Sequence, residues 1–377
     1  GHGQNRGWWV KPYFIKELIV LYCTEGDVDL ITCSANREIA EGIELLRNRF
    51  YVSRDDLKFS SRLSKHGLLF PRVNEQDHAV IKSVSKQKYD VAICLRRFIR
   101  QNSLVIMRKV KAKDKHCAWQ FPTNISRELA IKASRGWRHY DGPVSIFSEL
   151  SYYAEFAESI FGEHLDTRPR LQFCKQSKLD RQSGMVALGL SGNSTNWSDD
   201  YWFELVGFLS DAGCAIKLLG GPDVTALAER IEKQNPAVMN LVGQLNWKMT
   251  AAELQDCVAY IGNDTGLSHF ASLVVKKCLI IMGGGTFRRF FPWPDSTNQN
   301  LVYHGLECFD CNWQCKFDSR RCLALVTPRS VYQSYNKMMT DNQVREIDLN
   351  PMDIAYPLSW RRRPGSAQAL ISGRIIN

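Results

Sequence analysis

Apolar and polar positions alternate regularly along the second half of the chain. Short apolar runs bounded by glycine, proline or asparagine predict strands, and runs with apolar residues every three or four positions predict helices. Strands that alternate with helices predict a parallel sheet covered on both faces, as in a Rossmann-like domain. The expected strands are 185–190, 215–219, 238–242, 258–262, 278–282 and 301–303, and the expected helices are 198–212, 224–234 and 250–257.

The first half of the chain carries a weaker version of the same pattern. It predicts helices over 12–23, 37–50 and 148–161, and strands over 28–33 and 91–95. The polar stretch 166–182 is typical of a linker. The first residues are typical of a loop that follows a strand, so we expect a first strand upstream of Gly1. We therefore expect an N-terminal Rossmann-like domain over 1–170, a C-terminal one over 171–340, and a tail over 341–377 that crosses back to the first domain.

Composition agrees with a two-domain globular protein. The chain has 377 residues, 44% hydrophobic and 23% charged, and no apolar run long enough to span a bilayer. The segment from Gly1 to Arg6 does not resemble a signal peptide, which favours the cytoplasm.

The net charge of +10 favours an anionic partner. No nucleic-acid-binding module accompanies the basic residues, so we expect an anionic lipid surface or a phosphorylated acceptor, with the protein peripheral at the inner membrane. The basic residues gather at Arg96, Arg97, Arg100, Arg108, Lys109, Lys111, Lys113 and Lys115, and again at Arg361, Arg362 and Arg363.

The segment from Asn263 to His269 is the clearest candidate for a binding site. It reads Asn-Asp-Thr-Gly-Leu-Ser-His, and it lies between an expected strand and an apolar helix. A helix start leaves backbone N–H groups without intrahelical partners, and the helix dipole adds positive potential there, so this position suits a phosphate. Asp264 can cap the helix or bind a ligand hydroxyl. A plain helix cap and a buried histidine are the alternative interpretation.

Five segments in order resemble glycosyltransferase family 9, the ADP-heptose heptosyltransferases of lipopolysaccharide core synthesis and their relatives. The family's D-T-G-L-x-H donor signature is similar to residues 264–269. The other four segments are the loop 189–197, the turn Leu218-Leu219-Gly220-Gly221-Pro222, the stretch 242–245 and the cysteine-rich end 308–331. The resemblance covers roughly residues 184–338 and implies a GT-B fold, with two Rossmann-like domains facing a central cleft and a cysteine-rich loop in the second domain.

The resemblance implies a donor site for a nucleotide sugar, with an ADP-sugar favoured. It assigns donor binding to Ser194, Thr195, Asp264, Thr265, Gly266, Leu267 and His269. The family often has a lysine where this chain has Thr195, so we expect Lys217, Arg288 or Arg289 to supply the missing charge, and we place Arg288 in the donor site. Glycines 283–285 precede this arginine pair and allow a ligand to approach the backbone closely.

The general base is harder to place. The family's catalytic aspartate has no counterpart in the loop 1–9, where the matching position is Arg6. His2 and Asp141 are the two candidate bases, because an imidazole or a carboxylate can accept the proton of an acceptor hydroxyl.

Four cysteines cluster near the end of the second domain. Cys308, Cys311, Cys315 and Cys322 fall within 15 residues, and nearby cations favour thiolates. In a reduced compartment this density predicts a structural zinc or iron site; disulfides and free thiols are the alternatives.

The resemblance implies an inverting, metal-independent glycosyltransferase that moves a hexose or heptose from a nucleotide-diphosphate donor. The acceptor is a glycan, the lipopolysaccharide core, another lipid-linked sugar or a protein, and no nucleic acid is involved. No cofactor takes part in catalysis. The alternative is a non-catalytic GT-B domain that binds a nucleotide sugar or a glycan as a scaffold.

Overall fold

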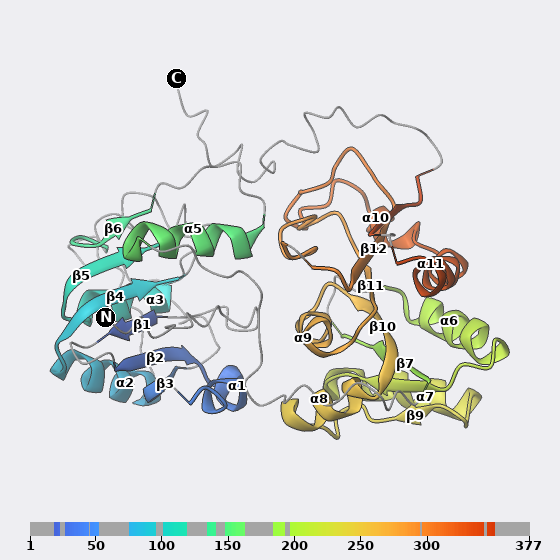
Figure 1. Cartoon of the computed structure of the whole chain (residues 1–377), viewed down its shortest axis with the longest axis horizontal. Helices are drawn as coiled ribbons and strands as arrows, with labels where there is room; N and C mark the ends of the chain where they lie inside the picture. Colours follow the sequence, from blue (N-terminus) through green and yellow to red (C-terminus); the bar gives the residue numbers. More distant parts are fainter. Residues whose placement is uncertain are drawn as a thin grey trace, which may run out of the picture. The chain divides into compact units, whose positions relative to one another are not determined.

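The structure is a computed structural model, and it describes residues 19–22, 27–44, 46–52, 75–95, 101–118, 134–140, 148–162, 184–192, 197–294, 296–342 and 345–350. Its contacts divide the chain into two compact units (Figure 1). One unit holds strands β1 to β6, and the other holds β7 to β13 together with the first turn of helix α5. The expected boundary at residue 170 lies outside the described residues.

The N-terminal unit is built on a six-stranded sheet of order β3-β2-β1-β4-β5-β6. Strand β1 is antiparallel to both of its neighbours, and the remaining pairs are parallel. The strands are β1 (Ile19–Tyr22), β2 (Val28–Cys33), β3 (Leu46–Val52), β4 (Tyr89–Cys94), β5 (Ala112–Cys117) and β6 (Arg138–His139), and the helices are α1 (Arg37–Glu41), α2 (Glu75–Lys86), α3 (Gln101–Lys109) and α5 (Glu149–Phe161).

Two helices expected in this unit are wrong in part. Residues 19–22 form β1, because a run of Ile, Val, Leu and Tyr suits a strand that pairs on both sides. The helix expected over 37–50 ends at Glu41, and residues 46–52 form β3. The Arg49 guanidinium on β3 donates to the carbonyls of Ala40, Ile43 and Leu46, which ties the strand to the end of the helix and the turn that follows it. The strands expected at 28–33 and 91–95 and the helix at 148–161 are confirmed within two residues.

A buried carboxylate joins three strands of this sheet. Asp29 on β2 is fully buried, and it accepts a two-pronged hydrogen bond from Arg47, with Nε and Nη2 each 2.9 Å from a carboxylate oxygen. The Tyr89 hydroxyl also donates to it at 3.1 Å. Asp27 has the spacing of a paired-carboxylate metal motif with Asp29, yet it too pairs with Arg47, at 3.2 Å. These acids therefore stabilise the sheet through Arg47.

The C-terminal unit is built on a seven-stranded, entirely parallel sheet of order β13-β12-β11-β10-β7-β8-β9. Figure 1 shows α8 and α9 beside this sheet, with α6 and α11 on another side. The strands are β7 (Met185–Gly189), β8 (Ile216–Leu219), β9 (Met239–Asn240), β10 (Cys257–Asn263), β11 (Cys278–Ile281), β12 (Gln299–Tyr303) and β13 (Glu346–Asp348), and the helices are α6 (Asp199–Asp211), α7 (Thr225–Gln234), α8 (Trp247–Gln255), α9 (Gly266–Val274), α10 (Arg321–Ala324) and α11 (Pro328–Thr340).

The expected strands and helices of this half are present. Their ends move by one to three residues, and the strand expected over 238–242 shrinks to the two residues of β9. The start of the segment expected to be a tail, 341–377, belongs to the C-terminal sheet, because β13 pairs with β12. Residues 351–377 lie outside the described residues. In a parallel sheet the carboxyl ends of the strands share one edge, so the loops after β7, β10 and β11 lie together there.

The buried side chain of Tyr260, on β10, positions the residues at that edge of the sheet. Its ring is fully buried, and a Cβ placed on Gly189 of β7 or on Gly262 would lie 1.9 or 2.3 Å from its hydroxyl. The hydroxyl lies 2.9 Å from Ser268 Oγ in the first turn of α9. Burial raises the pKa of Tyr260, so the hydroxyl keeps its proton. The two glycines thus create the space from which Tyr260 fixes the start of α9.

Among the helices of the described ranges, none is both long enough and apolar enough to cross a bilayer.

Replacing Gly189 by alanine is expected to lower the free energy of unfolding by about 2–4 kcal/mol, because the new methyl group overlaps the buried Tyr260 hydroxyl. Urea denaturation followed by tryptophan fluorescence measures the change.

Gly207 provides the matched control. It lies within α6, and a Cβ there meets nothing within 4 Å. Gly207→Ala is expected to raise stability by about 0.5–1 kcal/mol, because alanine favours the helix. Equal effects of the two substitutions would contradict this account of Tyr260.

Candidate functional site

The predicted donor motif lies at the junction of β10 and α9, on the carboxyl edge of the parallel sheet. Helix α9 begins at Gly266, with Thr265 as its N-cap and no side-chain cap bond. Gly266 is exposed and Leu267 is half-buried, so the helix reaches the surface at its first residue. Asp264 precedes the cap and is not the cap itself, which leaves its carboxylate to other partners.

The Asp264 side chain is held from two sides. The Thr286 hydroxyl, from the loop after β11, donates to Oδ2 at 3.4 Å. His269 Nε2 lies 3.7 Å from Oδ1, and both side chains are largely buried, at 7% exposed for His269 and 12% for Asp264. Because its environment fixes the carboxylate beside the α9 amides, Asp264 can present one oriented acceptor to a bound hydroxyl.

His269 is held by a stack of aromatic rings. Its ring lies 4.1 Å from that of Phe291 with an interplanar angle of 6°, and it is parallel to Trp293 at 5.9 Å. Phe290 packs edge-on at 6.3 Å. This packing directs the imidazole toward Asp264, so in this structure its clearest task is to orient that carboxylate. Direct contact with a donor stays a prediction.

Asn263 connects the donor motif to the loop after β7. It is 2% exposed, and its Oδ1 accepts from the Trp197 backbone N–H at 3.4 Å. Its carbonyl accepts from the Ser268 hydroxyl, inside α9. The last residue of β10 therefore positions both the helix start and the neighbouring loop. The sequence placed Asn263 in the candidate segment without giving it a role, and it did not single out Thr286.

The three cations expected to replace the family lysine all have acidic partners. Lys217 is 3% exposed and lies 2.7 Å from Glu253 Oε2. Arg288 Nη2 lies 2.5 Å from Glu346 Oε2, and Arg289 Nε lies 3.1 Å from Glu149 Oε1 within the same unit. Release of any of them toward a donor would break an ion pair. The role of Arg288 in donor binding therefore stays a prediction.

Glycines 283–285 serve a different purpose from the one expected. A Cβ on Gly283 or Gly285 would lie 2.6 or 2.2 Å from the Trp313 ring, and one on Gly284 would lie 2.4 Å from Phe309. The space beside these glycines is filled by two side chains of the protein. The expectation of a close ligand approach to all three is therefore wrong.

The four clustered cysteines are free thiols in this structure. Cys322 is buried, Cys308 and Cys311 are half-buried and Cys315 is exposed, and the described part of the chain contains no group of three or more His, Cys, Asp or Glu residues placed to hold a metal ion. This arrangement gives no support to the zinc or iron predicted from the spacing, and a structural metal at these cysteines stays a prediction. Burial raises the pKa of Cys308 and of Cys322, so the expected effect of nearby cations does not dominate at these two thiols.

Several predicted residues lie outside the described residues, namely the candidate bases His2 and Asp141 and the donor contacts Ser194 and Thr195. His139 precedes Asp141 by two positions in the sequence and ends β6. Its ring lies 3.3 Å from Cys117 Sγ and 3.1 Å from Ser134 Oγ. This exposed histidine is thus oriented at the carboxyl edge of the N-terminal sheet.

Comparison with known sequences gives a consistent result. Residues 78–318 match the model of Glycosyltransferase family 9 (heptosyltransferase). Lipooligosaccharide heptosyltransferase 2 of Campylobacter jejuni is 24% identical over 199 residues, which cover 50% of this chain and 63% of that relative. The enzyme of the same name from Haemophilus ducreyi is 27% identical over 284 residues, or 67% of this chain and 78% of that relative.

The fold is shared with solved heptosyltransferases of Escherichia coli. WaaC, solved with ADP-2-deoxy-2-fluoro heptose, superposes with a TM-score of 0.57 at 17% identity, over 82% of this chain and 89% of WaaC. ADP-heptose lps heptosyltransferase II superposes with a TM-score of 0.55 at 16% identity, over 83% of this chain and 89% of that enzyme. Since the family model spans well over half of the residues and its donor signature falls at the junction of β10 and α9, the chain belongs to glycosyltransferase family 9.

Proposed function

We propose that this protein transfers a heptose-like sugar from an ADP-linked donor to a glycan of the lipopolysaccharide core type. The observation that carries the proposal is the junction of β10 and α9, where an oriented Asp264 lies close to Gly266, the exposed first residue of the helix. Membership of the family supports the same reaction class. The sugar hydroxyls bind Asp264, and the diphosphate binds the amides of Thr265, Gly266 and Leu267.

The proposed reaction is an inverting displacement on the bound donor sugar. A base removes the proton of the acceptor hydroxyl, whose oxygen attacks the anomeric carbon. The bond from that carbon to the diphosphate oxygen breaks, and the electron pair leaves with the nucleotide. The α9 amides stabilise this developing charge, so the proposed step proceeds without a metal ion. His2 and Asp141 remain the proposed bases.

An anionic, lipid-linked acceptor suits the basic residues of the N-terminal unit. Arg108, Lys109, Lys111 and Lys113 are exposed over the end of α3 and the start of β5. Lys113 pairs with Asp90 at 2.6 Å, and the whole chain still carries a net charge of +10. Attraction to phosphorylated acceptors or lipid headgroups follows from this excess charge, and salt weakens it.

A panel of ADP-, GDP- and UDP-sugars tests the donor. A ligand that binds only the folded state raises the melting temperature, so the ADP-sugar is expected to give the largest shift. Differential scanning fluorimetry measures it. A preference for UDP would overturn the assignment of the donor, and binding without transfer to any acceptor would favour the scaffold alternative.

Asp264→Ala is expected to reduce kcat/KM for transfer by about 100-fold, because the sugar loses a charged hydrogen-bond acceptor in the reacting complex. Release of ADP in the presence of acceptor, measured by a coupled assay, gives the value.

The exposed Asp256, at the C-cap of α8, is the matched control. Asp256→Ala is expected to change kcat/KM by less than about twofold, since it lies on the surface away from the donor motif. Wild-type turnover by the Asp264→Ala variant would disprove the assigned role.

A further inference from the structure

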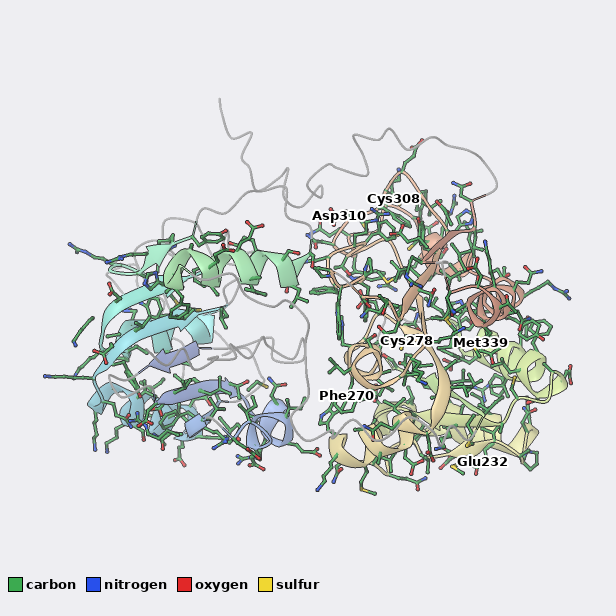
Figure 2. The ribbon with its side chains drawn as sticks, in the orientation of Figure 1. Glu232, Phe270, Cys278, Cys308, Asp310 and Met339 are labelled. Carbon is green, nitrogen blue, oxygen red and sulfur yellow. The ribbon has the colours of Figure 1, made fainter. Side chains whose placement is uncertain are left out.

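The cysteine-rich segment, residues 306–326, is attached to the loop after β11 at each of three consecutive glycines. The Trp313 ring covers Gly283 and Gly285, and Phe309 covers Gly284, with no space for a Cβ at any of them. All three glycines are buried. Figure 2 labels Cys278 at the start of β11, and it labels Cys308 and Asp310 on the cysteine-rich segment. The segment contacts Gly284 and Gly285, which follow the opposite end of β11.

Hydrogen bonds reinforce this packing. The Asp310 N–H donates to the Gly284 carbonyl at 2.5 Å, and the Asn312 N–H donates to the Gly285 carbonyl at 2.8 Å. Arg289 Nη1 also donates to Asn312 Oδ1 at 3.3 Å. The glycine loop, residues 283–285, is therefore held by hydrogen bonds to its backbone as well as by contact with the two aromatic rings.

The segment adopts a strained backbone to make these contacts. Asp310, Asn312 and Trp313 have φ angles of 67°, 51° and 62°, in the left-handed region that favours glycine. Such conformations are unfavourable for a bulky residue and persist where surrounding contacts enforce them, often next to functional sites. The turn that brings Trp313 over the glycines is thus maintained against its own conformational preference.

One peptide bond and one hydrogen bond connect the contact at Gly285 to the donor motif. Thr286 follows Gly285 directly, and its hydroxyl is the donor to Asp264 Oδ2. Because the Trp313 ring sets where Gly285 lies, it also sets where Thr286 can place its hydroxyl.

The other end of the segment reaches the opposite side of β10. The Trp197 Nε1–H donates to the Val326 carbonyl at 2.6 Å, and the Tyr201 hydroxyl donates to the Ala324 carbonyl at 3.0 Å. Since β11 and β7 are the two neighbours of β10, the segment ties together the loops on both sides of the donor motif.

We propose that Trp313 is a positioning residue of the donor site, acting through Gly285 and Thr286 on the carboxylate of Asp264. The inference rests on the proposed function for its ligand, and on the contacts above for its geometry. The tryptophan touches no substrate. It fixes the distance between the Asp264 carboxylate and the α9 amides, so that both engage one nucleotide sugar.

Substitution of Trp313 tests the inference in the full-length chain. Trp313→Ala is expected to raise the KM and Kd for an ADP-sugar by about tenfold with a smaller change in kcat, because a misplaced acceptor weakens donor binding first. Trp313→Phe keeps a ring over the glycines and is expected to restore the Kd to within about threefold of the wild-type value. Isothermal titration and initial-rate kinetics give these values.

Phe317→Leu is the matched control, because Phe317 lies in the same segment and contacts Lys316 and Arg321 instead of the glycines. It is expected to leave the donor Kd unchanged. Equal effects of Phe317→Leu and Trp313→Ala would mean that any damage to the segment weakens donor binding, and would overturn a specific role for Trp313.

A double-mutant cycle tests the route through Thr286. If Trp313 acts by placing the Thr286 hydroxyl, Trp313→Ala combined with Thr286→Val is expected to bind donor no more weakly than the weaker single variant. Fully additive losses would overturn that route.

Hydrogen exchange provides a measurement that needs no ligand. Amides of residues 263–270 are expected to exchange faster in Trp313→Ala than in the wild type or in Phe317→Leu, because the loop that holds Asp264 loosens. Unchanged exchange in that peptide overturns the inference even if no nucleotide sugar binds. Failure of the wild-type protein to bind any nucleotide sugar would overturn the proposed function instead.

Discussion

The hydroxyl of Tyr260 occupies a space between two neighbouring strands that exists only because Gly189 and Gly262 lack side chains. From there it meets Ser268, whose hydroxyl also donates to the Asn263 carbonyl. The strand end, the helix start and the loop after β7 therefore share one buried polar network. The hydrogen bonds of this network link the three parts of the chain directly. An accessible helix start beside Asp264 depends on this arrangement.

The backbone at the start of α9 supplies positive potential at this edge without any charged side chain. Lys217, Arg288 and Arg289 are each engaged with a glutamate. A helix terminus carries only a partial charge, but its amides are fixed in advance and need no reorganisation when an anion arrives. A site of this kind depends on the exact placement of α9, which explains why so many contacts converge on the residues around it.

The sequence was most informative where local pattern and tertiary context agree. Alternating strands and helices in the second half, and the binding motif at residues 264–269, follow from periodicity, capping and glycine. The pattern was misleading where context decides. Residues 46–52 are amphipathic in either state, and their pairing with β2 makes them a strand. Thr286 and Trp313 lie 22 and 49 positions beyond Asp264, and no local signal relates them to it.

The three glycines at 283–285 and the rings of Phe309 and Trp313 fit one another without spare volume. During sequence divergence, a side chain gained on the glycine loop would have to be matched by a smaller residue on the cysteine-rich segment. In a set of related chains, the sizes at these two places should be correlated across a gap of more than twenty residues.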